Sequence, residues 1–301
     1  MATISKTPSA TWKAVIRKRG WPTNIKTFRT KRDAEDWARR TEDEMVRGVY
    51  IDRAGSDRLL LKHALDRYLR EVSSTKKPST HSAEKHKAKA LKSSLGDYSL
   101  AAITPDLVAK YRDERLEAGK SPSTVRLELS LLSHLFTIAI KEWRVGLFYN
   151  PVANIRKPSP VKGRDRRLRG DEEQVLLNAC DQHSNPMLVW IARIALYTGM
   201  RAGEIKGLTR RQVNLDKRTV HLTETKNGSS RTVPQPREAV AVLRLALANP
   251  VRPIDTDLIF FGEPGRDKVR RPYEFRPARH RTLKQAGIKG LRFHDLRHEA
   301  V

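Results

Sequence analysis

Two stretches in the first half of the chain carry the same helix-start signal, and this signal constrains the fold more than any other feature. In "ITPDLVAKYRDERLEAG", Thr104 is a cap residue, Pro105 stands at the first helical position and Gly119 marks the end. "SPSTVRLELSLLSHLFTIAIKEW" repeats this start and is more apolar. Together with the apolar stripe of "DRLLLKHALDRYLREV", these segments predict a compact module of four or five helices over residues 56–155.

Residues 1–55 predict a smaller unit that consists of a β-hairpin and a helix. "WKAVIRK" and "IKTFRT" alternate in polarity on either side of the turn residues in "RGWPTN". A helical pattern follows from Lys31 and stops at Gly48. The basic side chains of the hairpin either lie against DNA or form a solvated surface. We favour DNA contact for Arg17, Lys18, Arg19 and Lys26.

Residues 156–169 interrupt the helical pattern with prolines, a glycine and several arginines, which predicts a basic linker. We expect this linker to follow a phosphate backbone through Arg166, Arg167 and Arg169. From residue 170 to 301, helical segments flank a hairpin in "RTVHLTETKNGSSRTVPQ", which predicts a mixed, mostly α domain. The whole chain is therefore expected to be mainly α with small β-sheets.

The charge of the chain indicates a polyanionic partner. Its 60 Lys and Arg residues exceed its 34 Asp and Glu residues, which gives a formal net charge of +26. Such a surplus favours nucleic acid over an anionic membrane or a ribosomal role, because the chain also carries much periodic apolar sequence. No apolar run approaches the length of a membrane span, the first residues lack a signal-peptide core, and Cys180 is the only cysteine. These features predict a cytoplasmic, nucleoid-associated protein that binds double-stranded DNA and no membrane.

Three motifs in the last domain carry candidate chemistry, although each has a plain structural explanation when taken alone. In "ALYTGMRAGEIKGL" an apolar helix ends at a glycine, and Arg201 begins the next helix with Glu204 on the same face to hold its rotamer. Lys226 sits at an Asn-Gly hairpin tip, from which it can reach into a site as a proton donor. In "LRFHDLRHEAV", His294 and Arg297 share one helical face. The sequence holds no further ligand cluster beside them, so a zinc site is not expected.

Because these motifs follow one another in a fixed order, the last domain resembles the catalytic domain of the tyrosine recombinases, the phage-integrase family. The helical module is similar to the core-binding domain of that family. Residues 1–55 are similar to the arm-type DNA-binding domain of lambda-like integrases. The resemblance implies a site-specific DNA recombinase that uses no metal and no cofactor. It also implies a homotetramer on paired attachment sites, with DNA-bending and excisionase-type accessory proteins as partners.

The resemblance further implies a role for each motif residue. Arg201 and Arg297 would bind the non-bridging oxygens of the scissile phosphate, and His294 would hydrogen-bond the same phosphate. Lys226 would protonate the leaving 5′ oxygen, and Glu204 would support Arg201. Two bidentate guanidiniums are suited to stabilising the charge of a phosphoryl transfer.

The sequence departs from the family pattern in one respect. The nucleophilic tyrosine of the family follows the His-x-x-Arg segment, whereas all seven tyrosines here precede it and the nearest is Tyr273. We therefore expect a truncated chain that lacks its nucleophile and does not cut DNA by itself, with a reading frame that continues past Val301 to a tyrosine. The alternative is a DNA-binding remnant of an integrase that occupies attachment sites or regulates a promoter.

Overall fold

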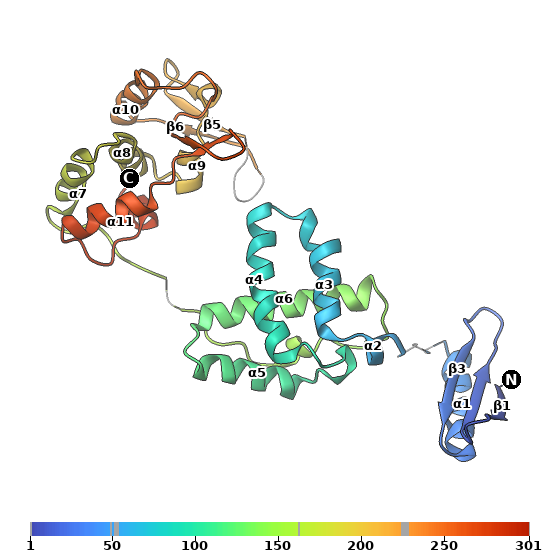
Figure 1. Cartoon of the computed structure of the whole chain (residues 1–301). Helices are drawn as coiled ribbons and strands as arrows, with labels where there is room; N and C mark the ends of the chain where they lie inside the picture. Colours follow the sequence, from blue (N-terminus) through green and yellow to red (C-terminus); the bar gives the residue numbers. More distant parts are fainter. Residues whose placement is uncertain (1, 49, 51–53, 162, 224–228, 301) are drawn as a thin grey trace. The chain divides into compact units, whose positions relative to one another are not determined.

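The chain forms two compact units, residues 1–162 and 163–301, and each is described by itself (Figure 1). The computed structural model describes residues 2–48, 50, 54–161, 163–223 and 229–300. Helices dominate, and the three sheets are small and antiparallel. The predicted fold class, mainly α with small β-sheets, is confirmed. The boundary between the two units falls within the predicted linker.

The N-terminal part of the first unit is a three-stranded antiparallel sheet followed by one helix. Its elements are β1 (Ala2–Lys6), β2 (Trp12–Ile16), β3 (Asn24–Phe28) and α1 (Lys31–Val46). Thr30 caps α1 by accepting a hydrogen bond from the backbone N–H of Asp33 at 3.2 Å. Buried Ile16 packs with Ala38 and Met45, so α1 covers one face of the sheet. The hairpin and the helix are as predicted, but strand β1 was missed because its residues were considered only as a possible signal peptide.

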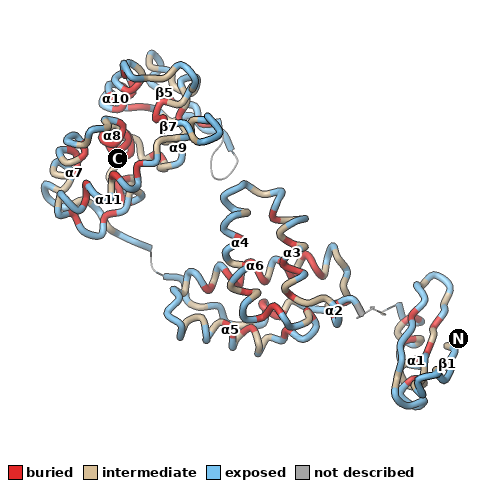
Figure 2. Tube along the Cα trace, in the orientation of Figure 1, coloured by how far each residue is buried: buried red, intermediate tan, exposed pale blue. Residues whose placement is uncertain are grey.

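The rest of the first unit is helical and has its own hydrophobic core. Its elements are α2 (Ala54–Arg58), α3 (Leu61–Glu71), η1 (Ser73–Thr75), α4 (Pro78–Leu95), η2 (Leu100–Ala102), α5 (Pro105–Glu117), α6 (Pro122–Lys141) and η3 (Pro151–Asn154). Thr104 and Ser121 cap α5 and α6 through hydrogen bonds of 3.3 and 3.2 Å, as the sequence predicts. Helix α6 packs against α3, α4 and α5 (Figure 1). The buried stretches of the tube in Figure 2 follow these contacts.

Helix α6 corrects the expectation that no segment approaches the length of a membrane span. By length and composition alone, its 20 residues are enough to cross a bilayer. However, Leu129, Leu132 and Leu135 on this helix are fully buried in the core of the helical part. The apolar character of α6 is therefore accounted for by its packing as the core helix of this part.

The second unit is built around helix α8, which contacts α7, α9, α10 and η5. Its elements are α7 (Glu172–Asp181), α8 (Met187–Thr198), α9 (Ala202–Lys206), η4 (Arg210–Gln212), β4 (Val213–Asn214), β5 (Thr219–Leu222), β6 (Arg231–Pro234), α10 (Arg237–Leu247), β7 (Phe261–Pro264), β8 (Arg270–Pro272), α11 (Arg276–Gln285) and η5 (Phe293–His298). The first sheet has the order β4-β5-β6, and β7 pairs with β8. The β7–β8 hairpin and α11 are additions to what the sequence predicts.

Candidate active site

The C-terminal end of α8 brings together residues that are far apart in the sequence. Gly199 ends the helix in the left-handed region, with φ of 58°, where glycine is favoured. A Cβ atom at this position would lie 3.3 Å from the Cβ of Ala300 and 3.7 Å from the carbonyl oxygen of Arg297, so the last segment packs directly against Gly199. The guanidinium Nε of Arg297 donates a hydrogen bond to the carbonyl of Gly199, 98 residues away in the sequence. The turn after α8 is thus one wall of the site.

Arg201 enters the site from the residue just before α9. Its backbone N–H donates to the carboxylate of Glu204 at 2.8 Å, and its guanidinium donates to the same carboxylate at 3.0 Å. The Glu204 side chain is 6% exposed, whereas that of Arg201 is 35% exposed. The contact expected between these two residues is present, and it fixes Arg201 while leaving part of its guanidinium open.

Arg231 is a third guanidinium at this carboxylate, and the sequence analysis did not single it out. It is the first residue of β6 and donates to the second oxygen of Glu204 at 2.8 Å. The Arg231 side chain is 40% exposed. In the sequence Arg231 follows the candidate residue Lys226 by five positions, but no local pattern links it with Glu204.

The electrostatics indicate an excess of positive charge at this point. Burial lowers the pKa of Arg297, and the nearby charges of Arg201 and Arg231 lower it further, while Glu204 opposes them. Burial alone would raise the pKa of Glu204, but hydrogen bonds from Arg201 and the charge of Arg231 lower it overall. Two guanidiniums therefore share the carboxylate of Glu204, and a third lies close enough for their charges to lower its pKa, so a bound anion would relieve the repulsion among the three.

His294 and Arg297 lie on η5, which is a 3-10 helix. A 3-10 helix has about three residues per turn, so side chains three positions apart stand on the same side. His294 is exposed, and its ring centre is 6.0 Å from that of His298. Among the described residues, no group of three or more His, Cys, Asp or Glu side chains is arranged to hold a metal ion.

Lys226 lies outside the described residues. The strands on either side of it are described: Leu222 of β5 pairs with Arg231 of β6. The position of the lysine relative to the arginines therefore remains a prediction.

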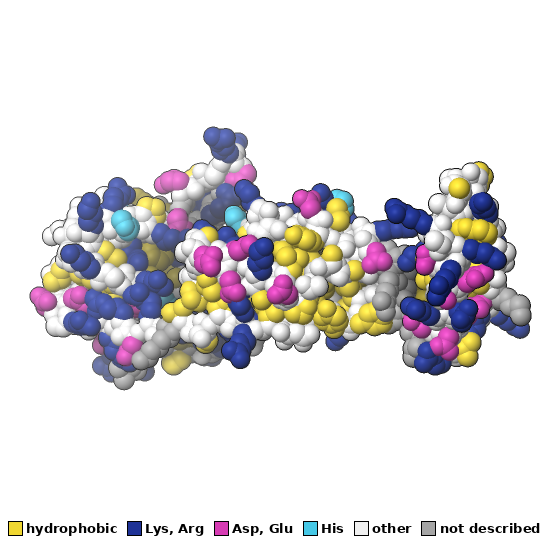
Figure 3. Space-filling model, turned by 90° about the horizontal axis from the view of Figure 1, so that it is seen from below, with side chains coloured by type: hydrophobic (Ala, Val, Ile, Leu, Met, Phe, Trp, Pro, Cys, Tyr) yellow, Lys and Arg dark blue, Asp and Glu magenta, His cyan; other side chains and the backbone are white. Residues whose placement is uncertain are grey.

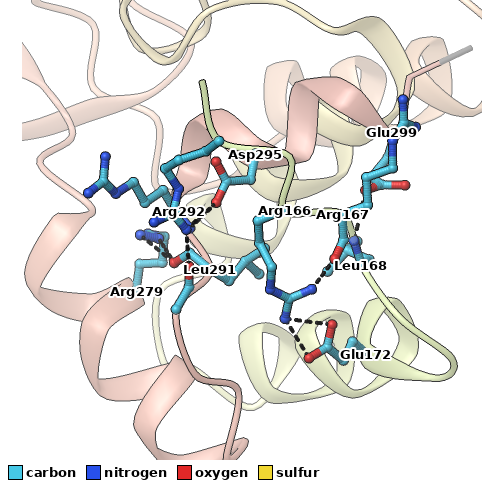
Figure 4. A network of polar contacts seen from close by, with 11 residues as sticks. Arg166, Arg167, Leu168, Glu172, Arg279, Leu291, Arg292, Asp295 and Glu299 are labelled. Carbon is cyan, nitrogen blue, oxygen red and sulfur yellow. Dashed lines mark hydrogen bonds and ion pairs between the residues drawn. The ribbon is translucent and has the colours of Figure 1, made fainter. Parts of the chain in front are cut away.

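The predicted linker residues Arg166, Arg167 and Arg169 differ in what they contact, and Figure 4 shows the first two. Arg166 donates two hydrogen bonds to Glu172, at 2.6 and 2.8 Å, and the pair is largely buried. Arg167 is exposed and donates to the carbonyl of His298 at 2.6 Å. Arg169 is exposed. Arg166 is therefore the least available of the three to a phosphate.

The basic residues predicted in the N-terminal part also lie in different places. Arg17, Lys18 and Arg19 follow β2 in the connection to β3. Lys26 pairs with buried Ala14, so it is on the same face of the sheet as α1, but it is exposed, with its ammonium 5.6 Å from the centre of the Phe28 ring.

The opposite, open face of this sheet carries Lys13, which the sequence analysis did not single out. Lys13 is exposed and pairs with Ser5 and Thr27. On the face shown in Figure 3, Lys and Arg side chains are scattered over the surface.

Tyr273 directly follows β8, and its backbone N–H donates to the carbonyl of Phe260 at 2.9 Å. It lines a pocket with Met187, the first residue of α8, and its neighbour Glu274 accepts a hydrogen bond from Lys206 of α9 at 3.0 Å. Burial also raises the pKa of Tyr273, which disfavours its phenolate.

Comparison with protein families gives two matches that together cover most of the chain. The model described as the phage integrase family matches residues 166–301. The model described as the phage integrase N-terminal domain matches residues 57–158. The first match contains Arg201, Arg231, His294 and Arg297.

Curated relatives and solved structures agree with these matches. A shufflon-specific DNA recombinase of Escherichia coli is 38% identical over 252 residues, and the match covers 81% of this chain and 61% of the relative. An integrase/recombinase homologue of Haemophilus influenzae is 33% identical over 258 residues, with 81% and 67% covered. This chain thus spans about three fifths of the first relative.

Among solved structures, a lambda integrase tetramer bound to a Holliday junction is similar with a TM-score of 0.62 at 21% identity, covering 98% of this chain and 89% of that one. The Tn1549 transposon integrase in complex with circular intermediate DNA gives a TM-score of 0.64 at 17% identity, covering 80% of this chain and 85% of that one. At these identities the likeness concerns the fold.

Proposed function

Because the chain belongs to the phage integrase family of tyrosine recombinases, we propose that its second unit binds the scissile phosphate of a site-specific recombination reaction. One observation carries this proposal: Arg201 and Arg231 share the buried carboxylate of Glu204, and Arg297, bonded to the carbonyl of Gly199, lies close enough for their charges to lower its pKa. Three guanidinium groups and one carboxylate have a net positive charge, which favours the binding of a phosphate. A purely structural ion pair would not require the additional guanidiniums.

In the proposed reaction, Arg201 and Arg297 bind the non-bridging oxygens of the phosphate, and His294 donates a hydrogen bond to it. Phosphoryl transfer is accelerated by positioning and by stabilisation of charge on these oxygens, which guanidiniums can supply without a metal. Lys226 delivers a proton to the leaving 5′ oxygen. Glu204 holds the side chains of Arg201 and Arg231 in place, which lowers the conformational entropy that they lose when the phosphate binds.

The covalent step requires a phenol oxygen as nucleophile. In the family this tyrosine follows the His-x-x-Arg segment, whereas Tyr273 precedes that segment, and burial raises its pKa. We propose that the 301-residue polypeptide binds its DNA site without forming a phosphotyrosyl adduct. A DNA-binding role at attachment sites or at a promoter is the alternative for this polypeptide.

The proposed substrate is double-stranded DNA, bound by a homotetramer on paired sites. Residues 1–55 would bind arm-type sequences through Arg17, Lys18 and Arg19, with Lys13 on the open face of the sheet. Residues 56–155 would bind the core site. Arg167 and Arg169 would add phosphate contacts, with smaller contributions from Arg166 and Lys26. DNA-bending and excisionase-type proteins are the proposed accessory partners, and the bacterial nucleoid in the cytoplasm is the proposed location.

The test begins with selection of bound sequences from a random duplex library by the 301-residue chain. We expect enrichment of a core site. Phosphate ethylation interference on that duplex should then reveal one phosphate whose effect disappears in Arg201→Ala and Arg297→Ala. An exposed arginine of the same unit, replaced in Arg237→Ala, should leave the interference pattern intact. Identical patterns in all the variants would refute the phosphate site.

An adduct test separates the two roles of the polypeptide. A nicked suicide duplex with the selected sequence should give no denaturant-resistant complex with the 301-residue chain. A complex that maps to one of its own tyrosines would overturn the proposal about the nucleophile and leave the phosphate site standing.

A further inference from the structure

The segment that enters the second unit lies along η5 and is joined to it at three places. We call residues 164–168 the strap. Arg164 donates to the carbonyl of Gly290 and to the carboxylate of Asp295, the latter at 3.2 Å. At the other end of the strap, Arg167 donates to the carbonyl of His298 at 2.6 Å. The backbone N–H of Leu168 donates to Glu299 at 2.8 Å (Figure 4).

The two carboxylates in this network belong to the same short segment as the candidate phosphate ligands. Asp295 and Glu299 contact the strap, whereas Arg297 contacts Gly199 at the end of α8. The side chain of Asp295 is only 4% exposed and also accepts the backbone N–H of Arg292 at 2.8 Å. In residues 294–299, side chains that contact the strap therefore stand next to the candidate phosphate ligands His294 and Arg297.

The strap is itself fixed to a different element of the unit. Arg166 makes its two hydrogen bonds to Glu172, the first residue of α7. Leu168 packs against the hydrophobic core. The strap thus bridges α7 and η5, and it starts directly after the boundary between the two compact units.

We propose that Asp295, Glu299 and Arg164 are positioning residues, which hold His294 and Arg297 in the orientation that binds phosphate. This inference rests on the proposed phosphate site and adds a dependence of that site on the strap. A six-residue 3-10 helix has weak internal hydrogen bonding and does not define its own orientation. Because the strap is continuous with the linker, displacement of the linker would be transmitted to both phosphate ligands.

The test uses the full 301-residue chain and inorganic phosphate as the probe. Isotope-labelled histidine makes each imidazole visible by NMR, and the His294 signal is assigned by its loss in His294→Gln. Phosphate should shift this signal saturably in the wild type and not in Arg201→Ala. The apparent Kd then reports the orientation of the site, independently of strand cleavage.

Two variants interrupt the strap at exposed or half-buried positions: Arg164→Ala and Glu299→Ala. Each should raise the phosphate Kd by about threefold to tenfold. The loss of a partner that orients a metal ligand weakens a metal site by about 10–100-fold, and the effect here should be smaller because Arg164 and Glu299 each supply only part of the contacts of the strap. Arg237→Ala, which removes an exposed arginine of the same unit outside the strap, is the matched control and should leave the Kd unchanged.

The outcomes separate the two ideas. If both strap variants bind phosphate as the wild type does, the positioning role is wrong, even if their Tm values fall, because a simple brace would change stability alone. If the wild type itself gives no saturable shift that depends on Arg201, the proposed phosphate site is wrong and the positioning role is wrong with it.

Discussion

Replacement of Glu204 by Gln tests the arginine cluster most directly. The change keeps the shape of the side chain but removes the charge that accepts hydrogen bonds from Arg201 and Arg231. A hydrogen bond to a charged partner contributes about 1.5–3 kcal/mol when it is buried. The two arginine side chains are 35% and 40% exposed, so we discount each contact to about 1 kcal/mol for screening by solvent.

The expected loss is thus about 2 kcal/mol in the free energy of unfolding of the second unit. For a unit of this size, that loss corresponds to a fall in Tm of roughly 5–10 °C. Calorimetric or circular-dichroism melts measure this value. Inorganic phosphate should restore more stability to Glu204→Gln than to the wild type, because the anion takes the place of the missing carboxylate among the guanidiniums.

Glu263→Gln is the matched control, since Glu263 is 97% exposed and its nearest recorded cation, Arg270, is 3.8 Å away. That variant should change the unfolding free energy by less than about 0.5 kcal/mol. If Glu204→Gln melts within a degree of the wild type and responds to phosphate in the same way, the carboxylate does not organise the arginines.

Three further predictions use other features of the chain. Gly199→Ala should lower the unfolding free energy by about 1–2 kcal/mol, since it combines a positive φ with a close approach of η5; melts at two phosphate concentrations check this. The pKa of Glu204 is lowered in the folded chain, so its stabilisation should be present above the ordinary glutamate pKa and be lost as pH falls through the lowered value; melts of wild type and Glu204→Gln should converge in that acid range. Replacement of Arg17, Lys18 and Arg19 by Ala should reduce the slope of log affinity against log salt by up to about 3 on arm-type DNA, and by less on core DNA.

Local signals in the sequence predict the elements that lead to the site, because each signal acts within a few residues. The Ser and Thr caps determine where α5 and α6 begin, and Gly199 determines where α8 ends. The contact between Arg201 and Glu204 could also be predicted, since the two residues are three positions apart at the start of a helix. These predictions depend only on local geometry.

Contacts between distant segments could not be predicted in the same way. The strap in "GRDRRLRG" looks like free positive charge, because Asp295 and Glu299 follow it by about 130 residues. The pair of Arg166 and Glu172, six positions apart, was within reach of the sequence and was missed. By contrast, no local sequence pattern links Arg231 on β6 with Glu204 on α9, because the two residues are 27 positions apart.

The two acidic residues near the site, Glu204 and Asp295, are buried for the same electrostatic reason. An exposed carboxylate beside a bound phosphate would repel it, so acids near such a site are disfavoured unless their charge is already engaged. Glu204 and Asp295 are almost fully buried and accept from a backbone N–H and a guanidinium. Both stand three residues after the backbone N–H that they accept, so one local device starts α9 and η5 alike. Arg201 and Arg297 therefore remain available to the site, while the negative charges of Glu204 and Asp295 are neutralised by hydrogen bonds within the fold.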